Sequence, residues 1–434
     1  AAAGVEYPGG FIGDATAVAT LPARVVACEP AQAPASCDAL VGGGRAVSSV
    51  GPQNDYVRAL IPADNGAVLA VGAAYGGASG VSIAMARFGT DGHMDTSFGP
   101  SGSGRMRVEV GREFSATAAA VDGQGRIVVV GFDPSTRENE DDTADVAVAR
   151  VFPDGRLDPS FGAGGVTYGA TDGPDRFAAV AIDASGRVLA AGAAVGETND
   201  FLLVRYATDG HLDPTFGDGG RVVTELRSAG TTGGHDHAVG IVLDPSGAIV
   251  LGGVVGQVHL DDNQLQNDGD FGLARYDAYG HLDPTFGQGG RVVTKLGPDL
   301  DRARALVRTD EGGYLLAGMS RFFEYGTEAA VVRYRLDGAL DDRFGLGGVV
   351  RTRPAATGNE LFAMVVTANG GLVVGAVVSD PIQFTSAGER IEPFSRWALA
   401  RFDLATGAPD LSFGDAGRTF TTLGGYRDEL FAML

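Results

Sequence analysis

Acidic residues recur at two places in this sequence, and their oxygen atoms could bind a cation. The first set stands at the beginning of one kind of apolar run: Asp55, Glu113, Asp175, Asp236, Asp301 and Asp428. The second set begins another kind of apolar run: Asp145, Asp200, Asp270 and Glu328. Clustered carboxylates without thiols suit Ca²⁺ or Mg²⁺. They equally accept hydrogen bonds from backbone N–H groups of neighbouring loops, so both interpretations stand at this point.

Calcium is the ion that we consider as a cofactor. Its first candidate ligands are the acids at the start of the first run: Asp175, Asp236, Asp301 and Asp428. A second candidate is the segment DDNQLQNDGD, in which Asp262, Asp268 and Asp270 are spaced somewhat like a calcium-binding loop.

Histidines offer a further metal site, although loop polarity explains their presence equally well. The residues concerned are His235, Asp236, His237 and His259. The sequence lacks a GxSxG elbow, an HExxH motif and a phosphate-binding P-loop. Two of the recurring acids could still stand at the separation that glycoside chemistry requires. An extracellular hydrolase or lyase therefore remains the alternative to a binding protein.

Aromatic side chains gather in two of the segments that join apolar runs. The set consists of Phe322, Phe323, Tyr325, Phe384, Phe394 and Trp397, the last being the one tryptophan of the chain. If at least three are exposed together, they form a platform for a sugar ring or a protein anchor. The alternative is that they pack beneath their own loops as small cores.

These candidates are positioned by a repeat whose clearest copy is His211–Leu226, HLDPTFGDGGRVVTEL. Its copies end in a Phe-Gly pair at Phe98, Phe161, Phe216, Phe286, Phe344 and Phe413. An Asp stands three residues before each Phe, and an Arg on an apolar run stands eleven or twelve residues before it. An Arg on an apolar strand needs a partner, so we predict that most of the six Arg–Asp pairs are buried and bonded within a blade.

Each repeat is predicted to form four short strands. In the clearest copy these are Phe177–Ile182, Arg187–Ala194, Asp200–Tyr206 and Arg221–Leu226. Short strands separated by Gly and Asp turns are typical of antiparallel blades, and four-stranded blades close into a propeller.

The spacing of the copies over 434 residues predicts seven blades in an all-β propeller. The C-terminal segment Asp428–Leu434 resembles the start of a blade at Asn359–Met364, and would be the innermost strand of the seventh. Segments Ala15–Leu21, Arg24–Cys28 and Arg45–Val50 would supply its other strands. Residues 1–51 thus complete the closing blade, and residues 52–434 form six repeats plus the closing strand. The alternative is six blades with a loose N-terminal extension.

The repeats resemble a known family. Their form, ARYxxxGxLDxTFGxGGxVxT preceded by AVAIDxxGRVLxAG, is similar to the delta-60 repeat family over about residues 52–434. The resemblance implies a β-propeller related to the NHL type, found in bacterial exported or surface proteins. It implies no single activity, and no catalytic residues carry over.

Charge and cysteine content indicate which partners and which cellular compartment to expect. The chain has 33 basic and 54 acidic side chains, a net charge of −21, and no basic stripe, which argues against nucleic acid as a partner. Cys28 and Cys37, the only cysteines, are predicted to form a local disulfide, as in an oxidising compartment. No apolar run is long enough to span a bilayer. We expect a secreted, periplasmic or cell-surface protein. Ala1 to Ala3 would suit the N-terminus that a signal peptidase leaves after cleavage.

Alternating strand direction places the most variable loops on one face. These loops are Asp133–Asp145, Val258–Asp270, Arg321–Glu328 and Ser379–Arg396. Function concentrates in such loops. The sequence therefore predicts a binding or structural module that recognises an extracellular protein or polysaccharide there, in a calcium-dependent way if the acids hold an ion.

Overall fold

The protein is described by a computed structural model. It describes residues 24–27, 40–41, 45–48, 50, 55–77, 80–133, 146–169, 175–196, 198–226, 234–257, 267–297, 300–322, 326–353, 357–379, 383–384, 390–391 and 395–421. Apart from two short 3-10 turns, η2 (Asp64–Gly66) and η3 (Pro100–Gly102), the regular elements in these ranges are strands. No helix in the described ranges is long and apolar enough to cross a membrane.

Six antiparallel sheets of four strands form six blades. The first blade contains β4 (Asp55–Pro62), β5 (Val68–Gly77), β6 (Gly80–Phe88) and β7 (Arg105–Val108). The second contains β8 (Ser115–Val121), β9 (Ile127–Phe132), β10 (Val146–Val151) and β11 (Val166–Tyr168). The third contains β12 (Arg176–Ile182), β13 (Val188–Ala194), β14 (Asp200–Tyr206) and β15 (Arg221–Thr224).

The other three blades repeat this order. The fourth contains β16 (His235–Leu243), β17 (Ile249–Gln257), β18 (Asn267–Tyr276) and β19 (Arg291–Thr294). The fifth contains β20 (Asp301–Arg308), β21 (Tyr314–Phe322), β22 (Gly326–Tyr334) and β23 (Val349–Thr352). The sixth contains β24 (Thr357–Val366), β25 (Gly371–Ser379), β28 (Ser395–Asp403) and β29 (Arg418–Thr421), with a small hairpin of β26 (Gln383–Phe384) and β27 (Arg390–Ile391) inserted before β28.

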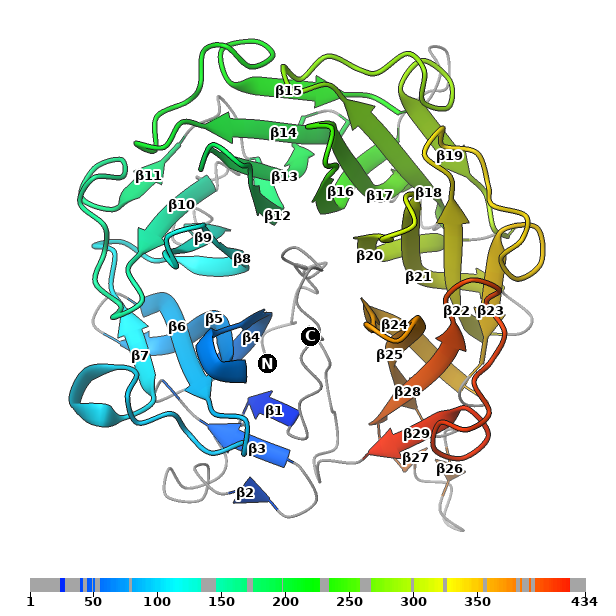
Figure 1. The fold of residues 1–434 in the computed structure, drawn as a ribbon, viewed down its shortest axis with the longest axis horizontal. Coiled ribbons are helices and arrows are strands. Elements are labelled where there is room, and N and C mark those ends of the chain that lie inside the picture. Colours follow the sequence, from blue (N-terminus) through cyan, green and yellow to red (C-terminus); the bar gives the residue numbers. More distant parts are fainter. Residues whose placement is uncertain are drawn as a thin grey trace.

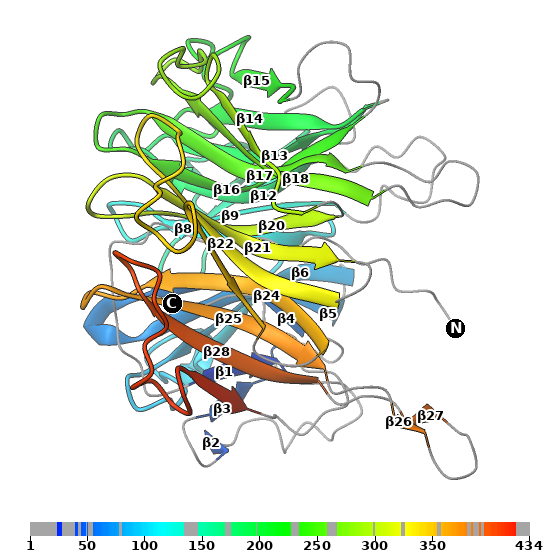
Figure 2. The same ribbon diagram turned by 90° about the vertical axis from the view of Figure 1, so that its right-hand side faces the viewer.

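The blades stand around a common axis, with the first strand of each nearest the centre and the fourth outermost (Figure 1). Every neighbouring pair within a blade is antiparallel, as β12 to β15 illustrate. The tight turns between first and second strands and between third and fourth strands therefore share one face, the turn face. The loops between second and third strands share the opposite face, the loop face, and Figure 2 shows the β26–β27 hairpin extending from it.

The prediction of seven blades was wrong. The N-terminal strands β1 (Arg24–Ala27), β2 (Leu40–Val41) and β3 (Arg45–Ser48) form a separate three-stranded sheet in the order β1-β3-β2. In it β1 and β3 are parallel, which requires a crossover rather than the successive hairpins of a blade. Six blades with an N-terminal extension is the observed arrangement. The proposed closing strand, residues 428–434, and the segment 15–21 lie outside the described residues.

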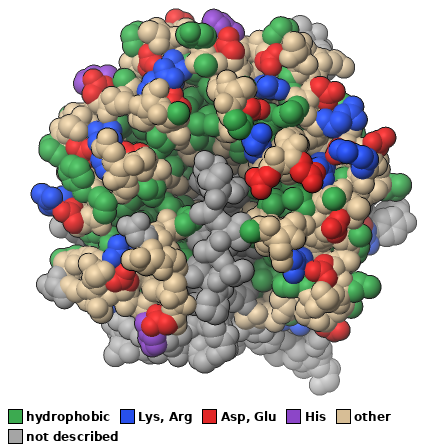
Figure 3. Space-filling view, in the orientation of Figure 1, with side chains coloured by type: hydrophobic (Ala, Val, Ile, Leu, Met, Phe, Trp, Pro, Cys, Tyr) green, Lys and Arg blue, Asp and Glu red, His purple; other side chains and the backbone are tan. Residues whose placement is uncertain are grey.

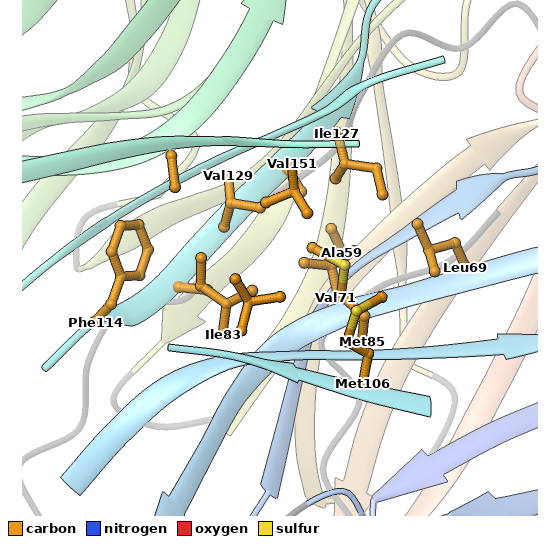
Figure 4. Close-up of a cluster of buried hydrophobic side chains, with 14 of the residues drawn as sticks. Ala59, Leu69, Val71, Ile83, Met85, Met106, Phe114, Ile127, Val129 and Val151 are labelled. Atoms are coloured by element: carbon orange, nitrogen blue, oxygen red, sulfur yellow. The ribbon is translucent and has the colours of Figure 1, made fainter. Parts of the chain in front are cut away.

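The core lies between blades. A strand such as β13, VLAAGAA, is buried along its whole length, because a neighbouring blade covers each face of its sheet. Figure 4 shows one such interface, where Ile83 and Met85 of β6 meet Ile127 and Val129 of β9. Small residues fit the tightly packed inner strands, whereas larger aliphatic and aromatic residues fill the space between blades.

Every innermost strand carries a β-bulge at the equivalent position. The extra residues are Arg58, Thr117, Ala178, Val239, Arg304 and Phe362. A bulge bends its strand and changes the direction of its side chain. Thr117 shows the effect, since its Oγ1 donates a hydrogen bond of 2.8 Å to the Phe177 carbonyl of the next blade.

Candidate functional site

The recurring Arg and Asp residues are bonded to each other in all six blades, as predicted. The Arg–Asp distances are 2.7 Å for Arg87–Asp95, 2.8 Å for Arg150–Asp158, 2.9 Å for Arg205–Asp213, 3.3 Å for Arg275–Asp283, 3.2 Å for Arg333–Asp341 and 3.3 Å for Arg401–Asp410. Burial was predicted for most pairs but is found in three: the arginines of the second, third and fifth blades are buried, and the other three are partly exposed.

Four of these arginines, those of the second to fifth blades, also connect neighbouring blades, which the sequence did not predict. Arg150 donates from Nη1 to the Thr208 carbonyl of the next blade, at 2.6 Å. Arg205 makes the equivalent bond to the Ala278 carbonyl. The Gly after the recurring Phe adds a backbone bond, from Gly217 N to the Tyr279 carbonyl at 2.8 Å. The repeated motif therefore holds the ring together on the turn face.

The turn face shows charges of both signs interspersed (Figure 3). The His211 and His281 side chains, equivalent residues of successive blades, are exposed there. Each follows an Asp that accepts a hydrogen bond from its backbone N–H. The recurrent polar residues of this face are thus part of the turns themselves.

On the loop face, the acids of the first strands bond to the backbone. Asp236 is buried, and it accepts hydrogen bonds from Leu226 N at 3.0 Å and Gly256 N at 2.8 Å. Leu226 belongs to the connection from the preceding blade and Gly256 to the end of β17, so this carboxylate joins two loops.

Asp175 and Asp301 have comparable roles. Asp175 accepts from Val195 N at 3.1 Å and pairs with Arg221 at 2.8 Å. Asp301 accepts from Leu296 N at 2.6 Å and from the Ser320 hydroxyl at 2.6 Å. The structure therefore gives these carboxylates the loop-bonding role that the sequence left open.

The acids of the third strands lie beside acids of the next blade. Burial raises the pKa of Asp200, and the neighbouring Asp236 and Glu225 raise it further. Burial also raises the pKa of Asp301, with Asp270 contributing. Among the described residues, no three His, Cys, Asp or Glu side chains lie close enough together to hold a metal ion.

The remaining metal candidates lie wholly or partly outside the described residues. Asp262, His259 and Asp428 are in segments that the structure does not describe, and Asp268 is described only as part of β18. The predicted disulfide residues, Cys28 and Cys37, are outside as well.

Of the six candidate aromatic residues, only Trp397 has a described side chain. It is 5% exposed and stands in β28 between Val377 and Thr421 of the adjacent strands, so it belongs to the core. Phe322 and Phe384 are described only as parts of β21 and β26, whereas Phe323, Tyr325 and Phe394 lie outside the described residues.

Sequence reasoning missed the residues on the other side of the inner strands. Successive side chains of a strand point to opposite faces, so the residue after Asp55, Asp175, Asp236 or Asp301 points away from that acid. These residues are Tyr56, Arg176, His237 and Arg302, and Ser115 takes the same register relative to the bulge in the second blade. The bulged residues stand two positions further on. Arg58, Thr117, Arg176, His237 and Arg302 are partly exposed, although they belong to innermost strands.

Basic side chains stand at these positions in the third to fifth blades. Burial lowers the pKa of His237 to about 3, and Arg304, Arg302 and Arg176 lower it further by their charge. The Arg304 guanidinium carbon lies 5.4 Å from the centre of the Phe362 ring, on the next blade. Nε2 of His237 and Nε of Arg302 are buried and have no hydrogen-bond partner among the described residues. We call Arg176, His237, Arg302 and Arg304 the basic cluster.

The solved structures that resemble the chain share little sequence with it. They include a GH43 endo-arabinanase from Bacillus licheniformis, with 14% identity, a TM-score of 0.31, and coverage of 58% of this chain and 83% of that chain. A PL25 ulvan lyase has 10% identity, a TM-score of 0.43, and coverage of 82% and 90%. A glucose dehydrogenase has 16% identity, a TM-score of 0.37, and coverage of 73% and 92%. At these scores the similarity carries no argument about activity.

Comparison at the level of sequence families is more specific. No curated protein matches the chain. Residues 64–98, 125–161 and 184–216, in the first three blades, match a family described as a domain of unknown function (DUF5122) β-propeller. The matched stretches contain the turns and the Arg–Asp pairs of these three blades. These three stretches are thus similar to the DUF5122 β-propeller family, and the structure has six four-stranded blades.

Proposed function

We propose that this protein is a secreted or cell-surface binding module, built from delta-60 repeats, that recognises a protein or glycan through its loop face. One observation carries the proposal: the recurring polar residues are occupied by the scaffold. The Arg–Asp pairs bond within and between blades, and the first-strand acids bond the loops. Residues used in this way hold the ring together and leave recognition to the parts that differ between blades.

The loops between second and third strands are the parts that differ most. They comprise residues 78–79, 133–145, 195–199, 258–266, 323–325 and 380–394. A rigid scaffold with loops of unequal length on one face is the arrangement that many binding proteins use. The delta-60 resemblance and the predicted disulfide between Cys28 and Cys37 support an extracellular setting.

A hydrolase or lyase is the second candidate, and one observation favours it. Asp200 has a raised pKa and lies beside Asp236, as in pairs of carboxylates that divide acid and base roles. However, both oxygens of Asp236 accept backbone hydrogen bonds, so it is held as a structural group. The binding module is therefore the function that the geometry supports best.

The experiment measures binding of the immobilised protein to arrays of extracellular polysaccharides and surface proteins. Replacing residues 380–394 by a two-residue Asn-Gly turn should abolish or redirect binding, because it removes the longest loop of the loop face. Leu346→Ser, on the turn face, is the control, since Leu346 is 89% exposed and its change should leave binding intact. The proposal fails if no target binds, or if the control variant loses binding as fully as the loop variant. Repeating the assay with a chelator tests the calcium requirement.

If the protein instead shortens a polysaccharide in solution, the result supports the hydrolase or lyase. Asp200→Asn should then abolish turnover while leaving the folded protein intact. A binding module predicts no turnover in either form.

A further inference from the structure

The third and fourth blades are joined on the loop face by a short parallel bridge between Asn199 and His235. Asn199 is the last residue of the loop 195–199, between β13 and β14, and His235 begins β16. The backbone N–H of Asp236 donates to the Asn199 carbonyl at 2.7 Å, and the backbone N–H of Asn199 donates to Nδ1 of His235 at 3.2 Å. One end of a loop on the recognition face is therefore held in part by an imidazole.

Only the neutral form of His235 can accept this hydrogen bond. A neutral imidazole carries one proton, which here is on Nε2 because Nδ1 accepts from Asn199. Protonation places a hydrogen on both ring nitrogens, so Nδ1 becomes a donor that faces another donor. Imidazoles ordinarily gain this proton between about pH 8 and pH 5, with a midpoint near 6.5. Mild acid therefore removes the bond.

Carboxylates beside the bridge supply negative charge that compensates an imidazolium formed there. Because the pairing is parallel, Asp200 lies beside Asp236, one residue beyond the bridged pair. Burial raises the pKa of Asp200, and the neighbouring Asp236 and Glu225 raise it further. Both oxygens of Asp236 accept backbone hydrogen bonds, from Leu226 and Gly256, so this carboxylate is occupied by the loops.

The second histidine of β16 does not titrate in the same range. Burial lowers the pKa of His237 to about 3, and the charges of nearby arginines and of His235 add to this effect. His237 is therefore neutral between about pH 5 and pH 7.5. The cations of the neighbouring strands are Arg176, Arg291, Arg302 and Arg304. Arginines keep their charge throughout this range, so His235 is the base of this corner that changes.

The backbone part of the bridge recurs in the ring, whereas the histidine does not. Phe114 N donates to the Val81 carbonyl at 2.9 Å between the first and second blades. In the fifth blade the residue in the place of His235 is Leu300, directly before Asp301, and it is 3% exposed. The scaffold can therefore be built without a titratable base at this place.

We propose that His235 is a pH-sensitive switch for the loop 195–199: the neutral imidazole bonds the end of the loop to the fourth blade, and the protonated imidazole releases it. The loop belongs to the loop face, so a ligand that contacts it should bind more weakly in mild acid. In this consequence the inference rests on the proposed binding function, to which it adds regulation by pH.

Hydrogen–deuterium exchange of the full chain, without ligand, tests the release. The measured quantity is the protection of the Asn199 amide, expressed relative to its intrinsic exchange rate at each pH. Protection should fall about threefold to tenfold between about pH 7.5 and pH 5, as expected for the loss of one hydrogen bond. The Leu226 amide, which donates to Asp236, is the internal reference and should keep its protection.

Three variants assign the change to His235. His235→Asn keeps an acceptor near the place of Nδ1 but binds no proton, so protection of Asn199 should stay high at both pH values. His235→Leu introduces the residue of the fifth blade and should give low protection at both. His281→Asn removes an exposed histidine of the turn face and should leave the change intact. Protection of the Leu226 amide shows that each variant is folded.

Several results would overturn the inference. Equal protection of Asn199 at both pH values in the parent would show that nothing is released. A change that persists in His235→Asn would assign it to another group, and Asp200 is the first candidate because its pKa is raised. Loss of protection at Leu226 as well would show that the whole face opens.

The switch and the binding function can fail separately. If array targets bind while exchange shows no release, the switch is lost and the binding function stands. If exchange shows the release while no target binds, the switch stands and the binding function is lost. A target of the loop face that binds equally at about pH 7.5 and pH 5, despite the release, would show that the switch does not regulate binding.

Discussion

The clearest structural prediction concerns Arg205, which joins the third blade to the fourth. Its side chain is 2% exposed, and its Nε donates to Asp213 at 2.9 Å. Its other nitrogens donate to the Thr215 hydroxyl at 3.3 Å and to the Ala278 carbonyl of the next blade. The guanidinium also lies 4.2 Å from the centre of the Phe216 ring. Arg205→Ala removes all of these contacts at once and leaves a cavity.

The expected loss of stability follows from what the substitution leaves behind. Asp213 is 7% exposed, and breaking a buried ion pair from one side costs about 3–5 kcal/mol. Arg187, whose Nη1 lies 3.6 Å from Asp213, remains as a second cation and places the expected cost near the lower end, about 3 kcal/mol. This is a large part of the ~5–15 kcal/mol that stabilises a typical domain.

Arg87→Ala is the matched control. Arg87 forms the equivalent pair with Asp95, but that pair is about one-fifth exposed, and Arg87 bonds only Asp95 and Ser97 of its own blade among the described residues. Its loss should cost about 1 kcal/mol or less. Urea denaturation of both variants and the parent measures the difference. Equal, small losses of stability in the two variants would refute the idea that the bond between blades accounts for the large contribution of Arg205 to stability.

The pH dependence of the Arg205→Ala effect provides an independent check. Burial alone would raise the pKa of Asp213, but hydrogen bonds from Thr215 and Arg205 together with the Arg205 charge lower it below 3.8. A lowered pKa stabilises the fold above pH 3.8, and the effect is lost as the pH falls. Without Arg205 this contribution shrinks, so the gap between variant and parent should narrow below about pH 4. A constant gap would show that cavity formation, rather than the stranded carboxylate, causes the loss.

Three further predictions concern other parts of the ring. At Gly280, where φ is +89°, an added Cβ would lie 2.8 Å from a side chain of the preceding blade, whereas a Cβ at Gly289 would meet nothing within 4 Å. Gly280→Ala should therefore lower the free energy of unfolding, measured by urea denaturation, by about 2 kcal/mol more than Gly289→Ala does. Because the folded pKa of His237 is about 3 and its ordinary value is 6.5, stability should fall as the pH drops from 6.5 towards 3, by up to about 1.4 kcal/mol per pH unit. His237→Gln should flatten that slope, and an unchanged slope would assign it to other groups. Cys28 and Cys37 should show no free thiol in denaturant without reductant, and two titratable thiols would exclude the predicted disulfide.

Much of the scaffold can be predicted from the sequence, because each copy of the repeat has the same structural requirements. The expected strand Asp200–Tyr206 matches β14, and Phe177–Ile182 is one residue shorter than β12. The Arg–Asp pairing follows from the need of an arginine on an apolar strand for a partner. These features depend on contacts within one repeat, where spacing along the chain fixes which residues meet.

The blade count depends on contacts that the repeat does not encode. The N-terminal 51 residues lack the Phe-Gly mark, so their assignment to a blade rested on length and on short apolar runs. The parallel pairing of Arg24 with Arg45 and of Ala27 with Ser48 is a long-range choice without a local turn signal. Neither composition nor alternation distinguishes such a sheet from three strands of a blade.

The inner surface was missed for a different reason, and the repeat itself shows where to look. Recurrence draws attention to residues that are the same in each copy, and the structure uses those residues to hold the blades together. Equivalent backbone positions that carry different side chains in each copy escape such a search. Tyr56, Ser115, Arg176, His237 and Arg302 occupy one such position, in register relative to the bulge, and no two neighbours in this series are alike. Sequence variation at a fixed structural position is therefore the signal that leads from the scaffold to the basic cluster.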